Sequence, residues 1–139
     1  MHERSASARQ LIFEKGRVME TEKKILIVDD EPDVLTILEK RLGNTGYEVI
    51  RAENGRRALL LAEREEPDLI ILDIDMPDMD GGEVAARLKD SESTKHIPVL
   101  FLSCLVTQKE EETNIVGDSV FVAKPYNPEK LIDQIEQLI

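Results

Sequence analysis

Apolar and polar stretches alternate regularly from Lys24 to the end of the chain. Four short runs are apolar at every position and lie at residues 25–28, 69–72, 99–102 and 120–123, and residues 47–52 form a fifth strand-like stretch that also carries charged residues. Runs that are apolar at consecutive positions indicate strands buried on both faces, as in a parallel sheet. The pattern therefore predicts a sheet whose strands are separated by other elements.

Each apolar run is followed by a stretch with helical periodicity. After the first run, Val34, Ile37, Leu38 and Leu42 recur at helical spacing behind Pro32, a residue that suits an early helical position. A second helix is predicted between the cap Asn54 and Pro67, and a third has Val84 and Leu88 on one face. Thr107 and Glu110 have capping-box spacing for a fourth helix that reaches Val116, and Asn127 and Pro128 begin the last helix. Five strands alternating with five helices predict an α/β fold, a doubly wound parallel sheet with helices on both faces.

The first 23 residues lack any sustained period. We expect residues 1–23 to be an N-terminal extension, flexible or left from cloning, and residues 24–139 to form the domain. Met19 is a candidate second start, because the strong pattern begins just after it. A helix through residues 11–13 that packs on a neighbouring molecule is the one ordered alternative for this segment.

Composition narrows the class of protein. The 139 residues include 41% apolar and 4% aromatic residues, so the core is expected to be aliphatic. The net charge of −11, concentrated after residue 23, argues against unaided nucleic-acid binding. No apolar run approaches the roughly 20 residues of a membrane span, and no secretory signal is visible. The single cysteine, Cys104, fits a reducing cytoplasm.

Chemically reactive side chains follow the predicted strands. Asp29, Asp30 and Glu31 come after the first strand, Asp73 and Asp75 after the third, Ser103 after the fourth, and Lys124 after the fifth. In open parallel sheets the carboxyl ends of the strands form the ligand site, so these residues are expected to converge. Clustered carboxylates repel one another, and a hard cation such as Mg²⁺ relieves that repulsion while leaving room for a phosphate oxygen.

Asp73 follows a wholly apolar strand and is the candidate nucleophile. A carboxylate can form an aspartyl phosphate when a cation and donors stabilise the phosphoryl oxygens. We expect Asp30 and Asp73 to bind Mg²⁺ directly and Asp29 through water, with Lys124 and Ser103 completing the site. Each residue also has a simpler explanation when it is considered alone. The acids after the first strand could serve merely to stabilise a helix N-terminus, and Lys124 could be an ordinary surface lysine.

The motifs resemble the receiver domain of two-component response regulators over residues 24–139. The matching stretches are Ile27-Val28-Asp29-Asp30-Glu31, Leu72-Asp73-Ile74-Asp75-Met76-Pro77-Asp78-Met79-Asp80-Gly81, Leu102-Ser103 and Ala123-Lys124-Pro125-Tyr126. The resemblance implies a flavodoxin-like, three-layer (βα)5 sandwich of strand order 2-1-3-4-5. It also implies Mg²⁺-dependent transfer of a phosphoryl group to Asp73 from a histidine kinase or a histidine phosphotransfer protein, with Mn²⁺ able to replace Mg²⁺.

The same resemblance assigns roles to single residues. It implies that the backbone carbonyl of Asp75 is a metal ligand beside Asp29, Asp30 and Asp73, and that the Cys104 backbone contacts the phosphate with Ser103 and Lys124. Phe121 falls on the switch aromatic of the family. Signalling would then pass to a downstream protein or a second copy through a face made by helix four, strand five and helix five. The stretch 116–119 departs from the family pattern.

Two other functions remain open from the sequence. Asp73-Ile74-Asp75 also fits the start of haloacid-dehalogenase-type phosphohydrolases, but in that family the paired acids come late, whereas here they precede Asp73. The second alternative is a receiver-like module that binds partners without being phosphorylated. Turnover of a generic phosphate ester would favour the first, and failure to take up phosphate would favour the second.

Overall fold

The apolar runs form one twisted sheet at the centre of the molecule. The computed structural model describes residues 11–14, 17–20, 23–77, 79–103, 113–116, 119–124 and 126–139. The parallel strands are β3 (Lys24–Val28), β4 (Glu48–Ala52), β5 (Leu69–Asp73), β6 (Val99–Ser103) and β8 (Ser119–Ala123). They are hydrogen-bonded in the order β4-β3-β5-β6-β8, which confirms the predicted order 2-1-3-4-5.

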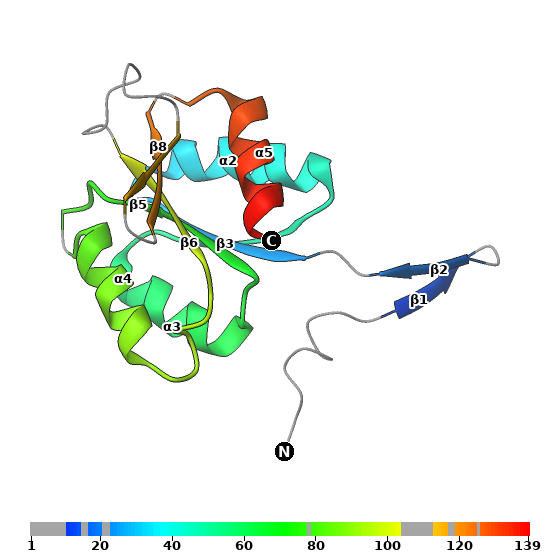
Figure 1. Cartoon of the computed structure of the whole chain (residues 1–139), viewed down its shortest axis with the longest axis horizontal. Helices are drawn as coiled ribbons and strands as arrows, with labels where there is room; N and C mark the ends of the chain where they lie inside the picture. Colours follow the sequence, from blue (N-terminus) through cyan, green and yellow to red (C-terminus); the bar gives the residue numbers. More distant parts are fainter. Residues whose placement is uncertain are drawn as a thin grey trace.

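Four described helices cover the two faces of this sheet (Figure 1). Helices α2 (Pro32–Thr45) and α5 (Pro128–Leu138) pack on one face, and α3 (Gly55–Glu65) and α4 (Gly81–Asp90) pack on the other. Alternate residues of each strand point to opposite sides, so Ile25 and Ile27 join the α2–α5 core whereas Leu26 and Val28 join the α3–α4 core. The three layers match the predicted architecture.

Helix starts follow the expected capping chemistry. The side chain of Asn54 accepts a hydrogen bond from the Arg57 amide at 2.8 Å, and Asn127 accepts bonds from the amides of Glu129 and Lys130. These bonds satisfy amide groups that have no partner within the helix. Both caps were predicted, and they fix where α3 and α5 begin beside the sheet.

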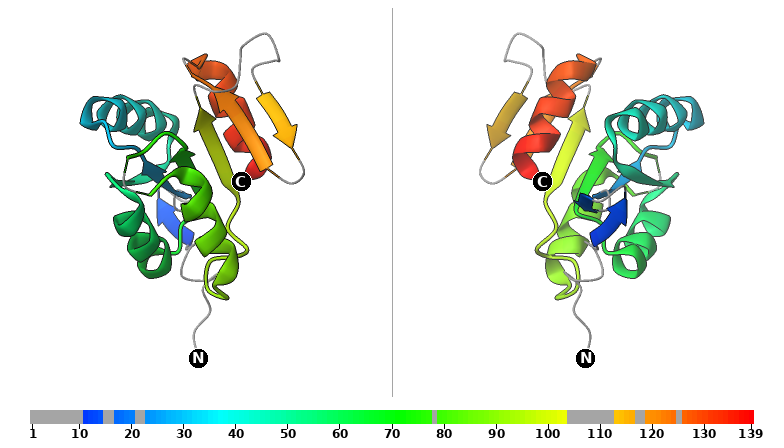
Figure 2. Two further views of the ribbon diagram at one scale, coloured as in Figure 1. Left: turned by 90° about the vertical axis from the view of Figure 1, so that its left-hand side faces the viewer. Right: turned by 90° about the vertical axis from the view of Figure 1, so that its right-hand side faces the viewer.

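Residues 113–116 differ from the sequence prediction. The sequence pattern predicts a fourth helix that reaches Val116, but residues 113–116 form strand β7 (Thr113–Val116), which pairs antiparallel with β8 at the edge of the sheet (Figure 2). The predicted start of that helix, at Thr107, lies outside the described residues. The register pairs Val116 with Ser119 and leaves two residues between the strands. Two β-rich runs around Gly117-Asp118 are a hairpin signal, which locally favours the strand.

The N-terminal segment also contains strands instead of the helix considered above. Strands β1 (Leu11–Glu14) and β2 (Arg17–Glu20) pair antiparallel, and Figure 1 shows this hairpin extending away from the central sheet. Lys23 begins the continuous part of the structure, and its side-chain nitrogen donates a 2.7 Å hydrogen bond to the backbone oxygen of Ile139. None of the described helices is both long and apolar enough to cross a lipid bilayer.

Candidate phosphoacceptor site

The switch point of the sheet lies between β3 and β5. From β3 the chain first adds β4 on one side and then β5 on the other, so the connections diverge between β3 and β5. Ligands of open α/β sheets bind at such a point, beyond the carboxyl ends of the strands. Asp29 directly follows β3, and Asp73 is the last residue of β5. The topology therefore brings these two aspartates together, as the sequence predicted.

Three carboxylates converge at this point. One side-chain oxygen each from Asp29, Asp30 and Asp73 lies within 4.8 Å of the other two. Asp29 and Asp73 are both only 1% exposed, whereas Asp30 is exposed at the rim. Two buried carboxylates and one exposed carboxylate at such spacing are costly without a cation, because burial disfavours the charged form and like charges repel.

Asp29 carries the clearest sign of this cost. Its Oδ1 accepts a 3.0 Å hydrogen bond from the Glu31 amide, but its buried Oδ2 accepts none. Burial raises the pKa of Asp29 from 3.8 to about 6; the Glu31 amide opposes this rise, and the charge of Asp73 adds to it. A buried acceptor without a donor fits an oxygen that is arranged to meet a cation.

Lys124 brings the positive charge of the site. It directly follows β8, and its amide donates a 3.0 Å hydrogen bond to the Ser103 carbonyl at the end of β6. Its Nζ lies 3.1 Å from Asp73 Oδ1 and 3.8 Å from Asp29 Oδ2. The lysine therefore neutralises part of the carboxylate charge and stands beside the candidate nucleophile.

The loop after β5 folds back on Asp73. Asp73 Oδ1 also accepts a 3.1 Å hydrogen bond from the Asp75 amide, and the Ile74 carbonyl accepts a 3.1 Å bond from the Gly81 amide. A Cβ atom on Gly81 would lie 2.6 Å from the Asp73 backbone oxygen, so only glycine fits here. Sequence reasoning did not give Gly81 a role in the site, although the Gly pair behind the capping Asp80 was a signal for close backbone approach.

The other predicted site residues differ in how deeply they are buried. Ser103 is 1% exposed at the end of β6, and Asp75 is exposed with its backbone beside Asp73. Phe121 is half-buried, and its ring stacks on Phe101 with centroids 4.8 Å apart and planes 17° apart. Cys104 lies outside the described residues. The aromatic ring of Phe121 thus faces the interior on the α3–α4 side of the sheet.

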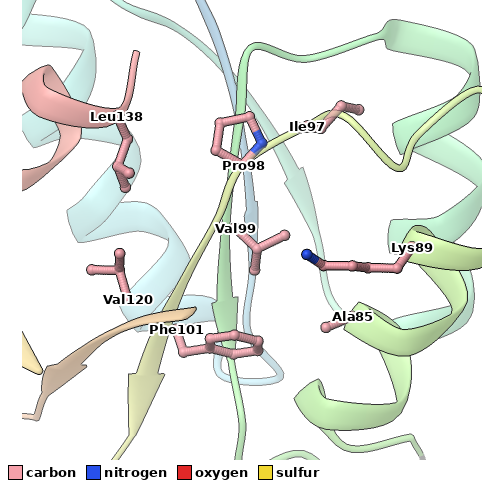
Figure 3. Close-up of a pocket in the computed structure, with 8 residues that line it drawn as sticks. All are labelled: Ala85, Lys89, Ile97, Pro98, Val99, Phe101, Val120 and Leu138. Carbon is pink, nitrogen blue, oxygen red and sulfur yellow. The ribbon is translucent and has the colours of Figure 1, made fainter. Parts of the chain in front are cut away.

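A separate hollow lies at the opposite end of the strands. It has a volume of about 110 Å³ and is lined by Ala85, Lys89, Ile97, Pro98, Val99, Phe101, Val120 and Leu138 (Figure 3). Pro98 and Val99 stand at the amino end of β6, whereas the aspartates stand at the carboxyl ends of the strands. The lining has one titratable group, Lys89, and no carboxylate, so it does not offer phosphoacceptor chemistry.

Comparison with known proteins agrees with this geometry. Residues 25–136 match the sequence model of the response regulator receiver domain family. The alkaline phosphatase synthesis transcriptional regulatory protein PhoP of Bacillus subtilis is 36% identical over 122 residues, covering 84% of this chain and 48% of PhoP. The polar-differentiation response regulator DivK of Brucella anthropi is 33% identical over 118 residues, covering 84% of this chain and 96% of DivK. The chain spans about half the length of PhoP and of the ycf27 regulators that it also resembles.

Solved structures show the same likeness. Chemotaxis protein CheY4 of Vibrio cholerae aligns with a TM-score of 0.75 at 32% identity, over 86% of this chain and 100% of CheY4. The receiver domain of sensor histidine kinase PA1611 from Pseudomonas aeruginosa aligns with a TM-score of 0.72 at 26% identity, over 85% of this chain and 98% of that domain. That structure holds a magnesium ion in its active-site cleft.

Fold and site together define a flavodoxin-like phosphoacceptor signalling domain. The chain belongs to the response regulator receiver domain family. It is the receiver domain of a two-component system, in which such a domain accepts a phosphoryl group on an aspartate. The family is one of signalling domains and not of classical enzymes, and its members bind Mg²⁺ at an acidic pocket. The family assignment argues against the phosphohydrolase alternative.

Proposed function

We propose that Asp73 is the phosphoacceptor and that it takes its phosphoryl group from a histidine kinase or a histidine phosphotransfer protein. The observation that carries this proposal is the buried Asp73 carboxylate, which has two further carboxylates within 4.8 Å and the Lys124 ammonium at 3.1 Å. No other described group of three or more His, Cys, Asp or Glu side chains converges in this way.

The donor set fits Mg²⁺, with Mn²⁺ as a substitute. The carboxylates of Asp29, Asp30 and Asp73 converge, and the backbone carbonyl of Asp75 is proposed as a further ligand. All these donors are oxygens, the hard ligands that these ions prefer. The Asp29 Oδ2, buried and without a hydrogen bond, supports a cation at this place. When bound, the cation supplies charge that neutralises the phosphoryl oxygens and the carboxylates.

The transfer itself is a displacement at phosphorus. An Asp73 carboxylate oxygen forms a bond to phosphorus as the bond between phosphorus and the donor imidazole nitrogen breaks, and that nitrogen keeps the electron pair. Lys124, held at 3.1 Å from Asp73 Oδ1, is positioned to pair with the phosphoryl oxygens once they arrive. Ser103 and the backbone of Cys104 are proposed to donate to the same oxygens, which helps the domain in its own phosphorylation and dephosphorylation.

Signalling is proposed to run through the β8 and α5 side of the molecule. Ser103 directly precedes residues 104–112, which fall outside the described residues, and its hydroxyl would move toward the phosphate. Phe121, stacked on Phe101, is the proposed switch side chain. A downstream protein or a second copy would then recognise the changed surface in the cytoplasm, without nucleic-acid binding by this chain and without a membrane.

The test is phosphate uptake measured by intact mass. Acetyl phosphate with Mg²⁺ is expected to add one phosphoryl group to the native chain, and EDTA is expected to block the addition. Asp73→Ala should abolish it, whereas the matched control Asp75→Ala should keep it, because only the backbone of Asp75 is proposed to bind the metal. Equal uptake by Asp73→Ala would refute the assignment, and no uptake by the native chain would favour the unphosphorylated partner-binding module.

A further inference from the structure

Helix α3 has an exposed basic strip that the receiver function does not use. Arg56, Arg57 and Arg64 are exposed along its outer face, and Leu60 between them is 45% exposed. Residues 57, 60 and 64 follow the i, i+3, i+7 spacing that places side chains on one side of a helix. A basic strip with an apolar centre is unusual in a chain whose net charge is −11.

The arginine side chains of this strip form no ion pair within the described part of the chain. No described carboxylate is ion-paired with Arg56, Arg57 or Arg64, whereas Arg51 pairs with Glu39 at 2.8 Å and Arg87 pairs with Glu83 at 2.9 Å. The first turn of α3 has no acidic residue, although the helix dipole favours acids there. Fold stability therefore does not account for these arginines, and an acidic surface would complement them.

Helix α5 presents that acidic surface. Glu129, Asp133 and Glu136 are exposed on its outer face, and the half-buried Ile132 lies between the two glutamates. Residues 129, 132 and 136 repeat the i, i+3, i+7 spacing of α3, with the opposite charge at both ends. Two helices with these faces pair each arginine with a glutamate in either relative direction.

We propose that α3 of one copy docks on α5 of a second copy. The two helices pack on opposite faces of the sheet, since α3 belongs to the core shared with α4 and α5 to the core shared with α2. One molecule cannot bring its own α3 to its own α5, so the contact joins different copies. It is head-to-tail, because each copy offers one face of each kind, and it leaves the aspartates at the carboxyl ends of the strands accessible.

Salt gives the contact a recognisable signature. Exposed ion pairs are individually weak, so association is expected only at high protein concentration. The Debye length is about 10 Å at 0.1 M salt and about 3 Å at 1 M, so moderate salt screens the repulsion between acidic molecules, while high salt also weakens the contact pairs. Association is therefore expected near 0.1 M salt and its loss is expected near 1 M.

The experiment is sedimentation equilibrium of the full chain and of two complementary variants. The double variant Arg57→Ser with Arg64→Ser, and the double variant Glu129→Gln with Glu136→Gln, should each associate about tenfold more weakly than the native chain. Mixing the two variants should restore one contact and give a species that stops at two chains, because each variant keeps one intact face. The charge-matched control Arg87→Ser with Lys95→Ser should associate like the native chain.

Other results would overturn the proposal. A native chain that stays monomeric at about 1 mM near 0.1 M salt would contradict the proposal. Variants that associate as strongly as the native chain would also contradict it, because the contact would then involve another surface. Phosphate uptake from acetyl phosphate is measured on every variant, and it should be unchanged. Failure of self-association and failure of Asp73 phosphorylation are thus separate outcomes.

Discussion

At the scale of single residues, the site contains carboxylates whose burial costs free energy. Asp29 is 1% exposed, has one carboxylate oxygen without a donor, and lies beside Asp73. Protein interiors tolerate such a group only when something else compensates for its charge. The same features that favour a cation at this site therefore reduce the stability of the protein when no cation is bound.

Replacing Asp29 should make the metal-free protein more stable at neutral pH. The pKa of Asp29 is about 6 when folded and near 3.8 when unfolded, so the folded state holds the proton more tightly. The stability linked to this proton is fully present below about pH 4 and is lost as the pH rises through 6, by up to about 3 kcal/mol. Asp29→Asn, which carries no charge, should raise the free energy of unfolding in EDTA at pH 7 and flatten its decline between about pH 4 and 6.

Chemical denaturation across pH measures this effect. The exposed Asp90, at the end of α4, gives a control variant, Asp90→Asn, that should change the unfolding free energy by less than about 0.5 kcal/mol. Added Mg²⁺ should stabilise the native chain more than Asp29→Asn. An Asn variant that is less stable than the native chain in EDTA would contradict the account of Asp29.

Gly81 gives a second prediction at this scale. A Cβ atom there would lie 2.6 Å from the Asp73 oxygen and 2.8 Å from Ile74 Cα, so Gly81→Ala forces the backbone around the acceptor to move. We expect a loss of about 1–3 kcal/mol in unfolding free energy and slower phosphate uptake. The control Gly43→Ala, on α2 with no atom within 4 Å of the new Cβ, should stabilise by up to about 1 kcal/mol. Similar effects of both changes on stability would count against this view of the loop.

The sequence predicts the site residues to different extents for physical reasons. Asp29, Asp73, Ser103 and Lys124 each directly follow or end a wholly apolar run, so strand position alone brings them to one edge of the sheet. The role of Gly81 depends on how a loop folds back on β5, and no periodicity in the sequence records that approach.

At the scale of elements, strand β7 changes how the sheet is connected. In the described part of the chain, β7 lies between the parallel strands β6 and β8 along the sequence, where the sequence pattern predicts a helix. Ser103 ends β6, and Thr113 pairs with Val122 near the end of β8, so both residues lie toward the carboxyl edge of the sheet. The capping-box spacing of Thr107 and Glu110 favoured a helix, but the β-branched residues that follow favour a strand.

The strand can be tested directly by nuclear magnetic resonance. We expect strand-like backbone chemical shifts for residues 113–116, and cross-strand Overhauser effects that link Ile115 with Val120 and Asn114 with Phe121. Residues of α5 serve as the internal reference for helical shifts. Helical shifts at residues 113–116, without the cross-strand effects, would show that the return between β6 and β8 is helical after all.

At the scale of the whole molecule, the central sheet and its two helical layers account for the site without the leading segment. Strands β1 and β2 pair only with each other in the sheet arrangement, and a lone two-stranded hairpin is marginally stable in water. We therefore predict a domain boundary near residue 23, because we expect the hairpin to contribute little to the core.

Removal of residues 1–18 tests that boundary. A chain that starts at Met19 should fold, with an unfolding free energy within about 0.5 kcal/mol of the native chain, and should take up phosphate at the same rate. Thermal unfolding followed by circular dichroism and intact mass after acetyl phosphate measure both properties. Gross destabilisation, or loss of uptake, would place residues 1–18 within the domain.

The hydrogen bond from Lys23 Nζ to the Ile139 backbone oxygen, at 2.7 Å, has a topological consequence. Residues 23 and 139 are close enough for a short glycine-rich linker to join them, and new ends can be opened in the turn at residues 91–97, at the amino edge of the sheet. The resulting circular permutant presents Lys124 before Asp29 and Asp73 in the chain. Because the site depends on where strands end in space and not on their order along the polymer, such a permutant should still accept phosphate.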